Sequence, residues 1–274
     1  MADYFDILFS DGHHPYTGRY TLWGYLLLTP NPARAVKRQL LLARKAVAAW
    51  CKKIPGKFRY PVPLYVFYLA GIFLVEQKRI DAAVAMLLML DTYARPSEAT
   101  DLRVESVVAP STGRGGPGLW GIIIGNEDLG DRTKTGESDD TVILGSSDRQ
   151  WIAEVVAKWY GKRSANNDDL MFPALDLAKL EALYRRAATH LKCGCVKITP
   201  HVCRHSAPSH DILNGIRNIG AVQRRGRWQH PKSVRRYEKS GRLLMQFTRV
   251  PLHLARRARS AGPALRDMIL AQLK

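Results

Sequence analysis

The sequence predicts an α+β protein that is mainly helical and carries one small antiparallel β-sheet. Apolar residues recur at helical spacing through most of the chain, as at Leu40, Ala43 and Val47. Only the middle departs from this pattern, with two short runs rich in β-branched residues at 118–125 and 140–145. The 274 residues show no internal repeat and are 46% hydrophobic, so we expect a globular chain with a sizeable core.

The N-terminal part ends at a break in the helical pattern. Residues 1–32 are aromatic and polar without clean periodicity, whereas residues 33–51 have the spacing of an amphipathic helix. Residues 52–63 then contain three prolines and a glycine, which is typical of a linker. We therefore expect an N-terminal segment over 1–55 and a main domain over 56–274.

The main domain is expected to combine helices with a β-hairpin. The helices are predicted at 62–77, 79–91, 148–160 and 176–192. Thr199-Pro200 indicates one more helix start, because Thr is a capping residue and Pro suits the first helical position. Pro208 is expected to kink or end that helix, since it cannot donate to the carbonyl of Arg204.

The distribution of charge indicates a polyanionic partner. The net charge is +18, and residues 201–274 hold sixteen Lys or Arg against three Asp or Glu. Such a field favours nucleic acid, although a solvated basic surface or a ribosome-associated protein would share it.

Cysteine usage and hydropathy bear on the compartment. Four cysteines in a chain of this length do not make a disulfide framework, so a reducing compartment is expected. The first residues do not form a secretory signal, and the longest apolar stretch, 62–75, is too short to span a bilayer. We expect an intracellular protein that does not enter a membrane, and that is nuclear if its source is eukaryotic and otherwise cytoplasmic or in the nucleoid.

Three segments carry residues suited to chemistry on a phosphate. The segment "TPHVCRHS" puts His201 and Arg204 three positions apart, on one face of a helix near its N-terminus. The segment "ARPSEATDLR" puts Arg95 and Glu98 at the same spacing, as a plain ion pair or as an arginine oriented by its neighbour. The segment "GRWQHPKSVRRYEKSGR" surrounds Tyr237 with six Lys or Arg side chains.

In this order, the three segments resemble the catalytic domain of the tyrosine recombinases, the phage integrase family. Trp228 lies nine residues before Tyr237, where the family has a His or Trp, and "RTKTG" offers Lys134 in the hairpin. The resemblance covers about residues 56–245. The segment "RWQHPKSVRRYEK" is more similar to recombinases of eukaryotic mobile elements than to bacterial resolvases. It implies the family's mainly helical catalytic fold and site-specific cleavage and rejoining of DNA through a covalent 3′-phosphotyrosine.

The resemblance assigns a role to each matched residue. The implied catalytic residues are Arg95, Lys134, His201, Arg204, Trp228 and Tyr237. The two arginines would clamp the phosphate oxygens, with Glu98 supporting Arg95, while His201 and Trp228 add N–H donors. Tyr237 would attack phosphorus as Lys134 protonates the leaving 5′ oxygen. No metal or other cofactor is expected, because these groups can replace an ion and no acidic cluster would hold magnesium.

The same resemblance implies double-stranded DNA as the partner. The expected phosphate contacts share one basic stretch: Arg224, Arg225, Arg227, Lys232, Arg235 and Arg236. The apolar-faced segment 254–274 is expected to join copies of the chain on DNA through the C-terminal helix, with packing on its own domain as the alternative. The segment 1–55 is short for the family's helical DNA-clamping domain, so we expect a reduced clamp or a fragment.

Several alternatives stay open in the sequence. His230, seven residues before Tyr237, competes with Trp228 as the donor beside the nucleophile. A crowded set of candidate zinc ligands comprises Cys193, Cys195, His201, Cys203 and His205, although ordinary buried thiols fit better because the spacing matches no common zinc pattern. The competing functions are a catalytically degraded, domesticated DNA-binding protein and a type IB topoisomerase-like nicking and rejoining enzyme.

Overall fold

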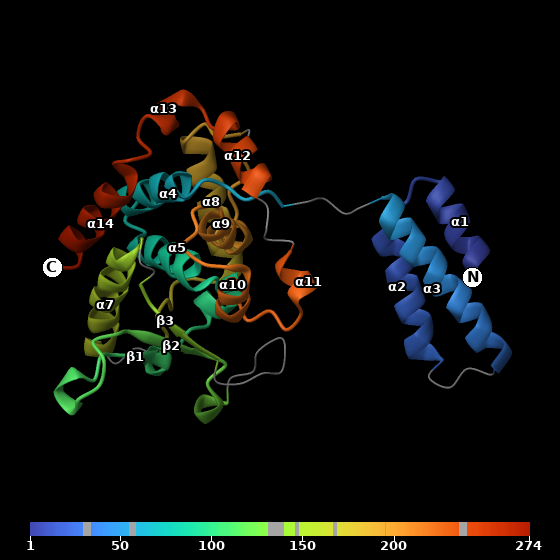
Figure 1. Ribbon diagram of the computed structural model, residues 1–274, viewed down its shortest axis with the longest axis horizontal. Coiled ribbons are helices and arrows are strands. Elements are labelled where there is room, and N and C mark those ends of the chain that lie inside the picture. The colour runs from blue at the N-terminus through green and yellow to red at the C-terminus, as the bar shows by residue number, and fades with distance from the viewer. Residues whose placement is uncertain are drawn as a thin grey trace. The chain divides into compact units, whose positions relative to one another are not determined.

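Two compact units divide the chain, Met1–Arg59 and Tyr60–Lys274 (Figure 1). The computed structural model describes residues 1–29, 34–54, 59–130, 140–145, 148–166, 169–194, 196–235 and 240–274. Within these ranges, no helix has both the length and the apolar character needed to cross a membrane.

The described residues of the first unit form three packed helices, α1 (Ala2–Ser10), α2 (Pro15–Leu28) and α3 (Arg34–Lys53). Their shared core contains Phe5, Leu8, Leu22, Leu40, Ala43, Val47 and Trp50. Gly18 lets α2 approach α3, because a Cβ atom there would lie 2.7 Å from the Trp50 ring. The helix expected over 33–51 is present, whereas α1 and α2 were not indicated by periodicity. The pattern of α2 is weak because large apolar side chains such as Tyr20 and Trp23 also cover its exposed face.

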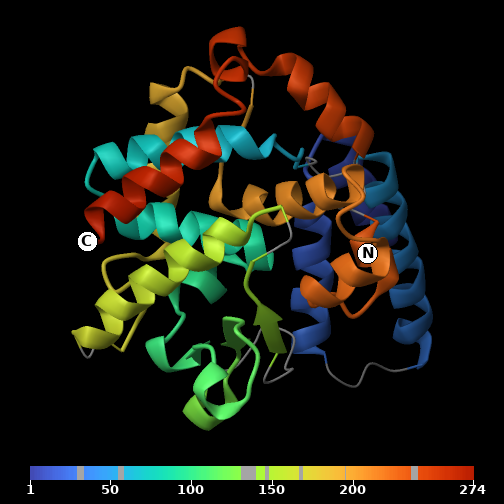
Figure 2. The same ribbon diagram turned by 60° about the vertical axis from the view of Figure 1, so that its left-hand side comes forward.

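The second unit is built around α5 (Ile80–Thr92), whose side chains are almost all buried. It packs against α4 (Leu64–Glu76), α7 (Gln150–Ala165) and α9 (Pro200–Leu213). In turn, α4 is covered by α8 (Leu177–His190) and by α14 (Ala261–Gln272), which lies beside it in both views (Figures 1 and 2). The apolar runs that predicted helices at 62–77 and 79–91 therefore form the centre of this core.

A small antiparallel sheet with the order β1-β2-β3 lies below α5 in Figure 1. The predicted hairpin consists of β2 (Gly121–Ile124) and β3 (Asp140–Ile143), with Ile122 opposite Val142. The edge strand β1 (Val107–Val108) was not predicted, because two residues are too few to show alternation. The mainly helical α+β fold class is confirmed.

Short elements follow the ends of the central helices. They are α6 (Pro96–Thr100), α10 (Ile219–Arg225), α11 (Pro231–Val234), α12 (Ser240–Arg249), α13 (Leu252–Ala255) and 3₁₀ turns at Val104–Ser106, Thr112–Arg114 and Glu127–Leu129. Because α6 follows α5 and α10 follows α9, the motif segments are carried by elements that the core already holds in place.

Pro208 does not end the helix that carries Arg204. The helix α9 continues to Leu213, so the expected early stop was wrong. Thr199 is the N-cap and Pro200 lies in the first turn, although the Thr199 side chain makes no capping hydrogen bond. Pro208 itself is buried, and packing of the helix in the core outweighs the loss of one backbone hydrogen bond.

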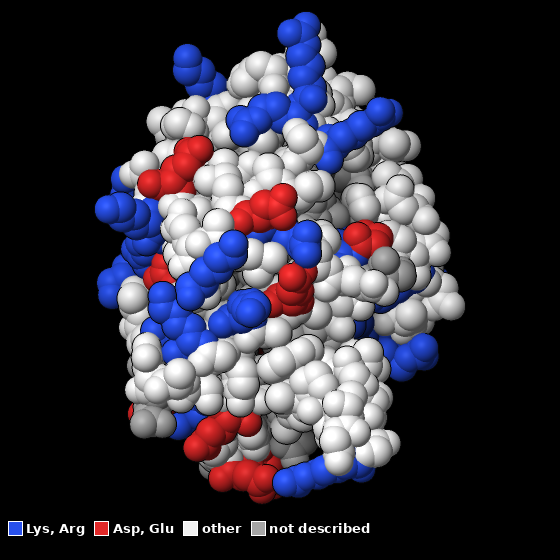
Figure 3. Space-filling view, turned by 90° about the vertical axis from the view of Figure 1, so that its left-hand side faces the viewer, with Lys and Arg blue, Asp and Glu red and all other residues white. Residues whose placement is uncertain are grey.

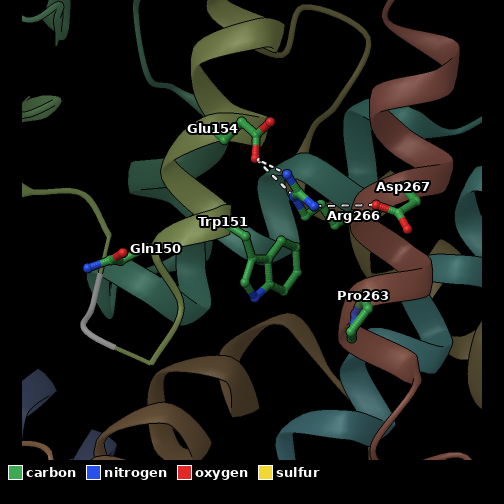
Figure 4. A pocket seen from close by; sticks show the side chains of 6 residues that line it. All are labelled: Gln150, Trp151, Glu154, Pro263, Arg266 and Asp267. Carbon is green, nitrogen blue, oxygen red and sulfur yellow. Dashed lines mark hydrogen bonds and ion pairs between the residues drawn. The ribbon is translucent and has the colours of Figure 1, made fainter.

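The C-terminal helix packs on its own unit. Leu265 and Ile269 of α14 are fully buried, and Gly71 of α4 leaves room for Leu265, since a Cβ atom there would lie 2.7 Å from it. Arg266 donates through Nε and Nη2 to one oxygen of Glu154 on α7, at 2.9 and 2.7 Å (Figure 4). Of the two expectations for the C-terminal segment, packing on its own domain is therefore the one observed.

The face formed by α7 and α14 carries charges of both signs. Figure 3 shows Lys and Arg there interspersed with Asp, Glu and uncharged surface. A surface of mixed sign does not attract a polyanion as a continuous basic surface does. On this face the Lys and Arg side chains therefore do not form one continuous basic surface.

Candidate active site

Arg95 and Glu98 form an ion pair at the start of α6. Arg95 is the N-cap residue, and its amide donates to Glu98 Oε2 at 2.7 Å while its guanidinium donates to Oε1. Pro96 begins the helix, where its fixed φ angle suits the first turn. The spacing of the motif thus folds Arg95 over this turn and leaves 20% of its side chain exposed.

Glu98 also binds arginines from distant segments. Arg227 donates to Glu98 Oε2 at 2.6 Å, and Arg204 Nη1 lies 3.9 Å from the same oxygen. Burial alone would raise the pKa of Glu98, but the charge of Arg227, the Arg95 amide and the other two guanidinium charges outweigh it and lower that pKa. One ionised carboxylate therefore gathers three arginines.

Arg204 is held by backbone carbonyls in the interior, with only 2% of its side chain exposed. It donates to the carbonyl of Tyr93, at the end of α5, and to the carbonyl of Gly226, at the end of α10, with a distance of 2.6 Å to the latter. Its Cζ atom lies 4.7 Å from the ring centroid of Trp228, within the range of a cation–π interaction. Two element ends and one aromatic ring thus fix the direction of this guanidinium.

Trp228 is closely packed on its neighbours. Its ring stacks on Tyr93 with centroids 6.3 Å apart and planes at 26°. Gly226 allows this position, because a Cβ atom there would overlap the indole. His230, by contrast, is exposed at the N-cap of α11. Of these two candidate donors Trp228 is the one that contacts Arg204, and its role as a donor to phosphate stays a prediction.

The structure brings together Arg95, Arg204 and Trp228 out of the six predicted catalytic residues. His201 lies one turn before Arg204 on α9, half-buried, with its ring centroid 5.7 Å from that of His205. Lys134, Tyr237, Arg236 and the side chain of Lys232 lie outside the described residues. The placement of the nucleophile and of the general acid therefore stays a prediction.

The predicted phosphate contacts divide into exposed and internal arginines. Arg224 and Arg235 are exposed. Arg225 instead donates to the carbonyl and to the carboxylate of Asp91, at 2.7 and 3.1 Å. Arg227 is only 4% exposed and is held by the carboxylate of α6. In this structure Arg225 ties α10 to Asp91 of α5, and Arg227, just after α10, is bound to Glu98 of α6, so their phosphate contacts stay a prediction.

A buried ionic network behind the site was not predicted. Asp211 on α9 accepts from Arg149 at 2.8 and 3.0 Å, and also from Arg217 and from the hydroxyl of Tyr93. Burial would raise the pKa of Asp211, but the hydrogen bonds it accepts and the charge of Arg149 lower that pKa well below its ordinary value. One signal was available in the sequence, because Asp211 lies seven residues after Arg204, two turns along the same helix face.

Candidate metal ligands among the described residues are engaged in other contacts. The Cys203 thiol lies 3.4 Å from the hydroxyl of Tyr184, and burial raises the pKa of this thiol to about 12. Cys193 donates to the Ala188 carbonyl at 3.4 Å, and Cys195 lies outside the described residues.

One further group of possible ligands lies in the ionic network. Ligand atoms of Asp148, His210 and Asp211 fall within 4.8 Å of one another. The Arg149 guanidinium pairs with both carboxylates, at 3.0 and 2.8 Å, and so supplies the positive charge that they require.

Comparison with known proteins matches the chain to one family. The model of the phage integrase family matches residues 73–242, more than half of the chain. Among solved structures, the XerH site-specific recombinase bound to difH substrate in a pre-cleavage complex is similar with a TM-score of 0.49 at 15% identity, covering 80% of this chain and 66% of that one. Its post-cleavage complex with palindromic difH gives 0.48 at 15% identity, covering 80% and 68%. No curated protein matches the chain, which spans about two thirds of the length of these recombinases.

Proposed function

Because the chain belongs to the phage integrase family of tyrosine recombinases, we propose that it cleaves and rejoins double-stranded DNA at specific sites through a covalent 3′-phosphotyrosine. Tyr237 is the nucleophile and Lys134 the general acid. The scissile phosphate is bound by Arg95, His201, Arg204 and Trp228. Exposed arginines of the C-terminal quarter contact the flanking phosphates.

One observation carries this proposal. Arg95 and Arg204, 109 positions apart in the sequence, are held around Glu98 and beside Trp228. Arg227 joins them at Glu98 and also lies 3.9 Å from Asp140, so three cations face two carboxylates, which leaves one positive charge in excess. Such an excess is costly away from water unless an anion completes it, and a phosphodiester supplies that anion. Its transition state carries more negative charge on the same oxygens, so the arginines bind it more strongly than the substrate.

The chemistry balances with side chains alone. The Tyr237 oxygen attacks phosphorus while its proton passes to His201, and the bond from phosphorus to the 5′ oxygen breaks as Lys134 protonates that oxygen. Rejoining reverses these steps with a 5′ hydroxyl as the attacking group. A free tyrosine has a pKa of about 10 and is ionised about once in a thousand at neutral pH, so a positive site that favours the phenolate assists the attack.

A nicked suicide substrate tests the proposal. The short strand released by cleavage diffuses away and cannot be rejoined, so the covalent adduct accumulates. With a library of nicked duplexes of randomised sequence, we expect a protein–DNA adduct that survives denaturant and forms in EDTA. Tyr237→Phe is the matched control, because it removes one oxygen: DNA binding should persist and the adduct should disappear.

The other outcomes identify the competing functions. DNA binding without any adduct across the library would indicate a binding protein that has lost catalysis. An adduct without strand exchange between two sites would indicate a topoisomerase-like enzyme. An adduct in Tyr237→Phe would move the nucleophile to another residue.

Assembly of several copies on DNA belongs to the same proposal. The route through the C-terminal helix would require α14 to leave its own unit, because Leu265 and Ile269 are already buried there. We therefore expect assembly to occur on DNA while α14 stays in place. Cross-linking on a two-site duplex tests this: protein–protein cross-links to α14 would contradict it.

A further inference from the structure

Tyr93 contacts the site through three separate parts of one residue. It is fully buried at the end of α5, two positions before Arg95. Its carbonyl accepts a hydrogen bond from Arg204, and its ring stacks on Trp228. Its hydroxyl donates to Asp211, on the helix that carries Arg204. Tyr93 therefore links α5, α9 and the segment after α10.

The backbone of Tyr93 has a conformation that large side chains avoid. Its φ angle is 56°, in the left-handed region where helix ends usually carry glycine. Arg227, directly before Trp228, has a φ of 55°, so the segments on both sides of the aromatic stack are in this conformation. Residues held in such conformations gather at functional sites, where the surrounding contacts impose them. A glycine would end α5 without strain but would offer neither a ring nor a hydroxyl.

We propose that Tyr93 is a positioning residue for the phosphate-binding site: its ring sets the plane of the Trp228 indole and its carbonyl sets the direction of the Arg204 guanidinium. This inference rests on the proposed recombinase function and adds a residue to it. Tyr93 does not touch DNA; it acts through the two side chains that do.

The packing around Trp228 explains why a flat ring is needed. The Trp228 indole packs directly against Gly226, and the Arg204 guanidinium lies 4.7 Å from the ring centroid. Tyr93 supplies a nearly parallel surface, at 26°. A narrow aliphatic side chain would let the indole tilt and carry its N–H donor away from the phosphate oxygen. Misplacement of a catalytic group by about 1 Å can lower a rate about a hundredfold.

A matched pair of variants separates the ring from the hydroxyl. Tyr93→Phe and Tyr93→Leu both lack the hydroxyl that binds Asp211, and only the leucine variant lacks the flat ring. In single-turnover cleavage of the suicide substrate, we expect Tyr93→Phe to stay close to wild type and Tyr93→Leu to fall about tenfold to a hundredfold. DNA affinity should be equal in both. If the leucine variant does not fold, Tyr93→Met, with an unbranched side chain, takes its place.

A double-mutant cycle shows whether the ring acts through Trp228. In a Trp228→Ala background, Tyr93→Leu should lower the cleavage rate little further, because the indole that it positions is gone. A plain loss of stability would instead lower the rate by the same factor in both backgrounds. Equal factors would overturn the proposal, as would equal losses in the phenylalanine and leucine variants.

A spectroscopic measurement tests the positioning without relying on activity. In protein labelled with 5-fluorotryptophan, the ¹⁹F signal of Trp228 is assigned by its absence in Trp228→Phe. This signal should move in Tyr93→Leu and stay in place in Tyr93→Phe. An unmoved signal in the leucine variant would overturn the positioning role even if the wild type cleaves DNA. A moved signal in a wild type that never forms an adduct would support the positioning and count against the proposed function alone.

Discussion

Some arginines of this chain are held by near neighbours in the sequence, and others by acids and carbonyls that lie far away in it. Spacing alone predicted the pair of Arg95 with Glu98, and the structure contains it. Spacing could not predict that Arg227 would turn inward to the same carboxylate, because its partner is 129 positions away. A basic residue in a basic run is expected to face solvent, and only a buried acid from another element reverses this.

Replacing Asp211 tests the buried network. The folded-state pKa of Asp211 is lowered, so its contribution to stability is present above the unfolded pKa of about 4 and is lost as pH falls through the folded value. Asp211→Asn removes the main counter-charge of Arg149 and should cost about 3 to 5 kcal/mol at neutral pH. It should also flatten the fall in stability at acid pH. Urea unfolding from pH 3 to 7 measures the free energy of unfolding and its dependence on pH, and Asp267→Asn, at an exposed position, is the control. An equal dependence of stability on pH in wild type and Asp211→Asn would contradict the account.

Adding one methyl group at Gly226 tests whether the position of the Trp228 indole matters. A Cβ atom there would overlap the Trp228 ring, whereas at Gly220, within the helix α10 that Gly226 caps, the nearest atom would lie 3.5 Å away. Gly226→Ala should therefore displace the indole and lower adduct formation about a hundredfold, while Gly220→Ala stays near wild type. Single-turnover cleavage and DNA binding are measured side by side. Equal rates in the two variants would mean that the position of Trp228 does not matter for chemistry.

At the scale of elements, the sequence predicted those helices and strands that are long enough to show a periodic apolar pattern. The helices α4, α5, α7 and α8 of the second unit follow from apolar spacing, and the hairpin of β2 and β3 follows from β-branched runs. The helix α2 was missed because apolar side chains cover its outer face too, and β1 because it has two residues. Pro208 misled because a local rule about one hydrogen bond does not include the packing of a buried helix.

The packing of α14 predicts a large difference between two leucines. Leu265 is fully buried against α4, whereas Leu252 is 76% exposed. Leu265→Ala should lower the free energy of unfolding by about 2 to 5 kcal/mol, and Leu252→Ala should change it by less than about 0.5 kcal/mol. Urea unfolding of the DNA-free protein measures both. A small effect at Leu265 would show that α14 does not hold this position in solution.

At the scale of the whole molecule, the order of motifs predicted more than any single motif. The prediction of a tyrosine recombinase is confirmed by the family match over residues 73–242. Three short patterns, each weak alone, identified the family because they occur in one order over more than 140 residues. Charge distribution gave only a class of partner, since a net charge of +18 does not say which arginines face outward.

The salt dependence of DNA binding should separate outward from inward arginines. Log affinity should fall linearly with log salt concentration, because bound phosphates release counterions. Exposed Arg235→Gln should reduce this slope by about one, whereas buried Arg227→Gln should lower stability without a matching change in slope. Fluorescence anisotropy over a salt series gives the slopes. Equal changes of slope in the two variants would indicate that Arg227 contacts DNA phosphates.

The central claim is that Tyr237 is covalently bonded to the DNA 3′ phosphate during the reaction. Trypsin cuts after Arg236 and Lys239, so digestion of a nuclease-trimmed adduct should release the peptide Tyr237–Lys239 with a nucleotide on its phenol oxygen. Mass spectrometry of the wild-type adduct should find this peptide with its added mass, and the same preparation from Tyr237→Phe should lack it. A nucleotide on any other residue, or no modified peptide from a preparation that has cleaved its substrate, would contradict the account.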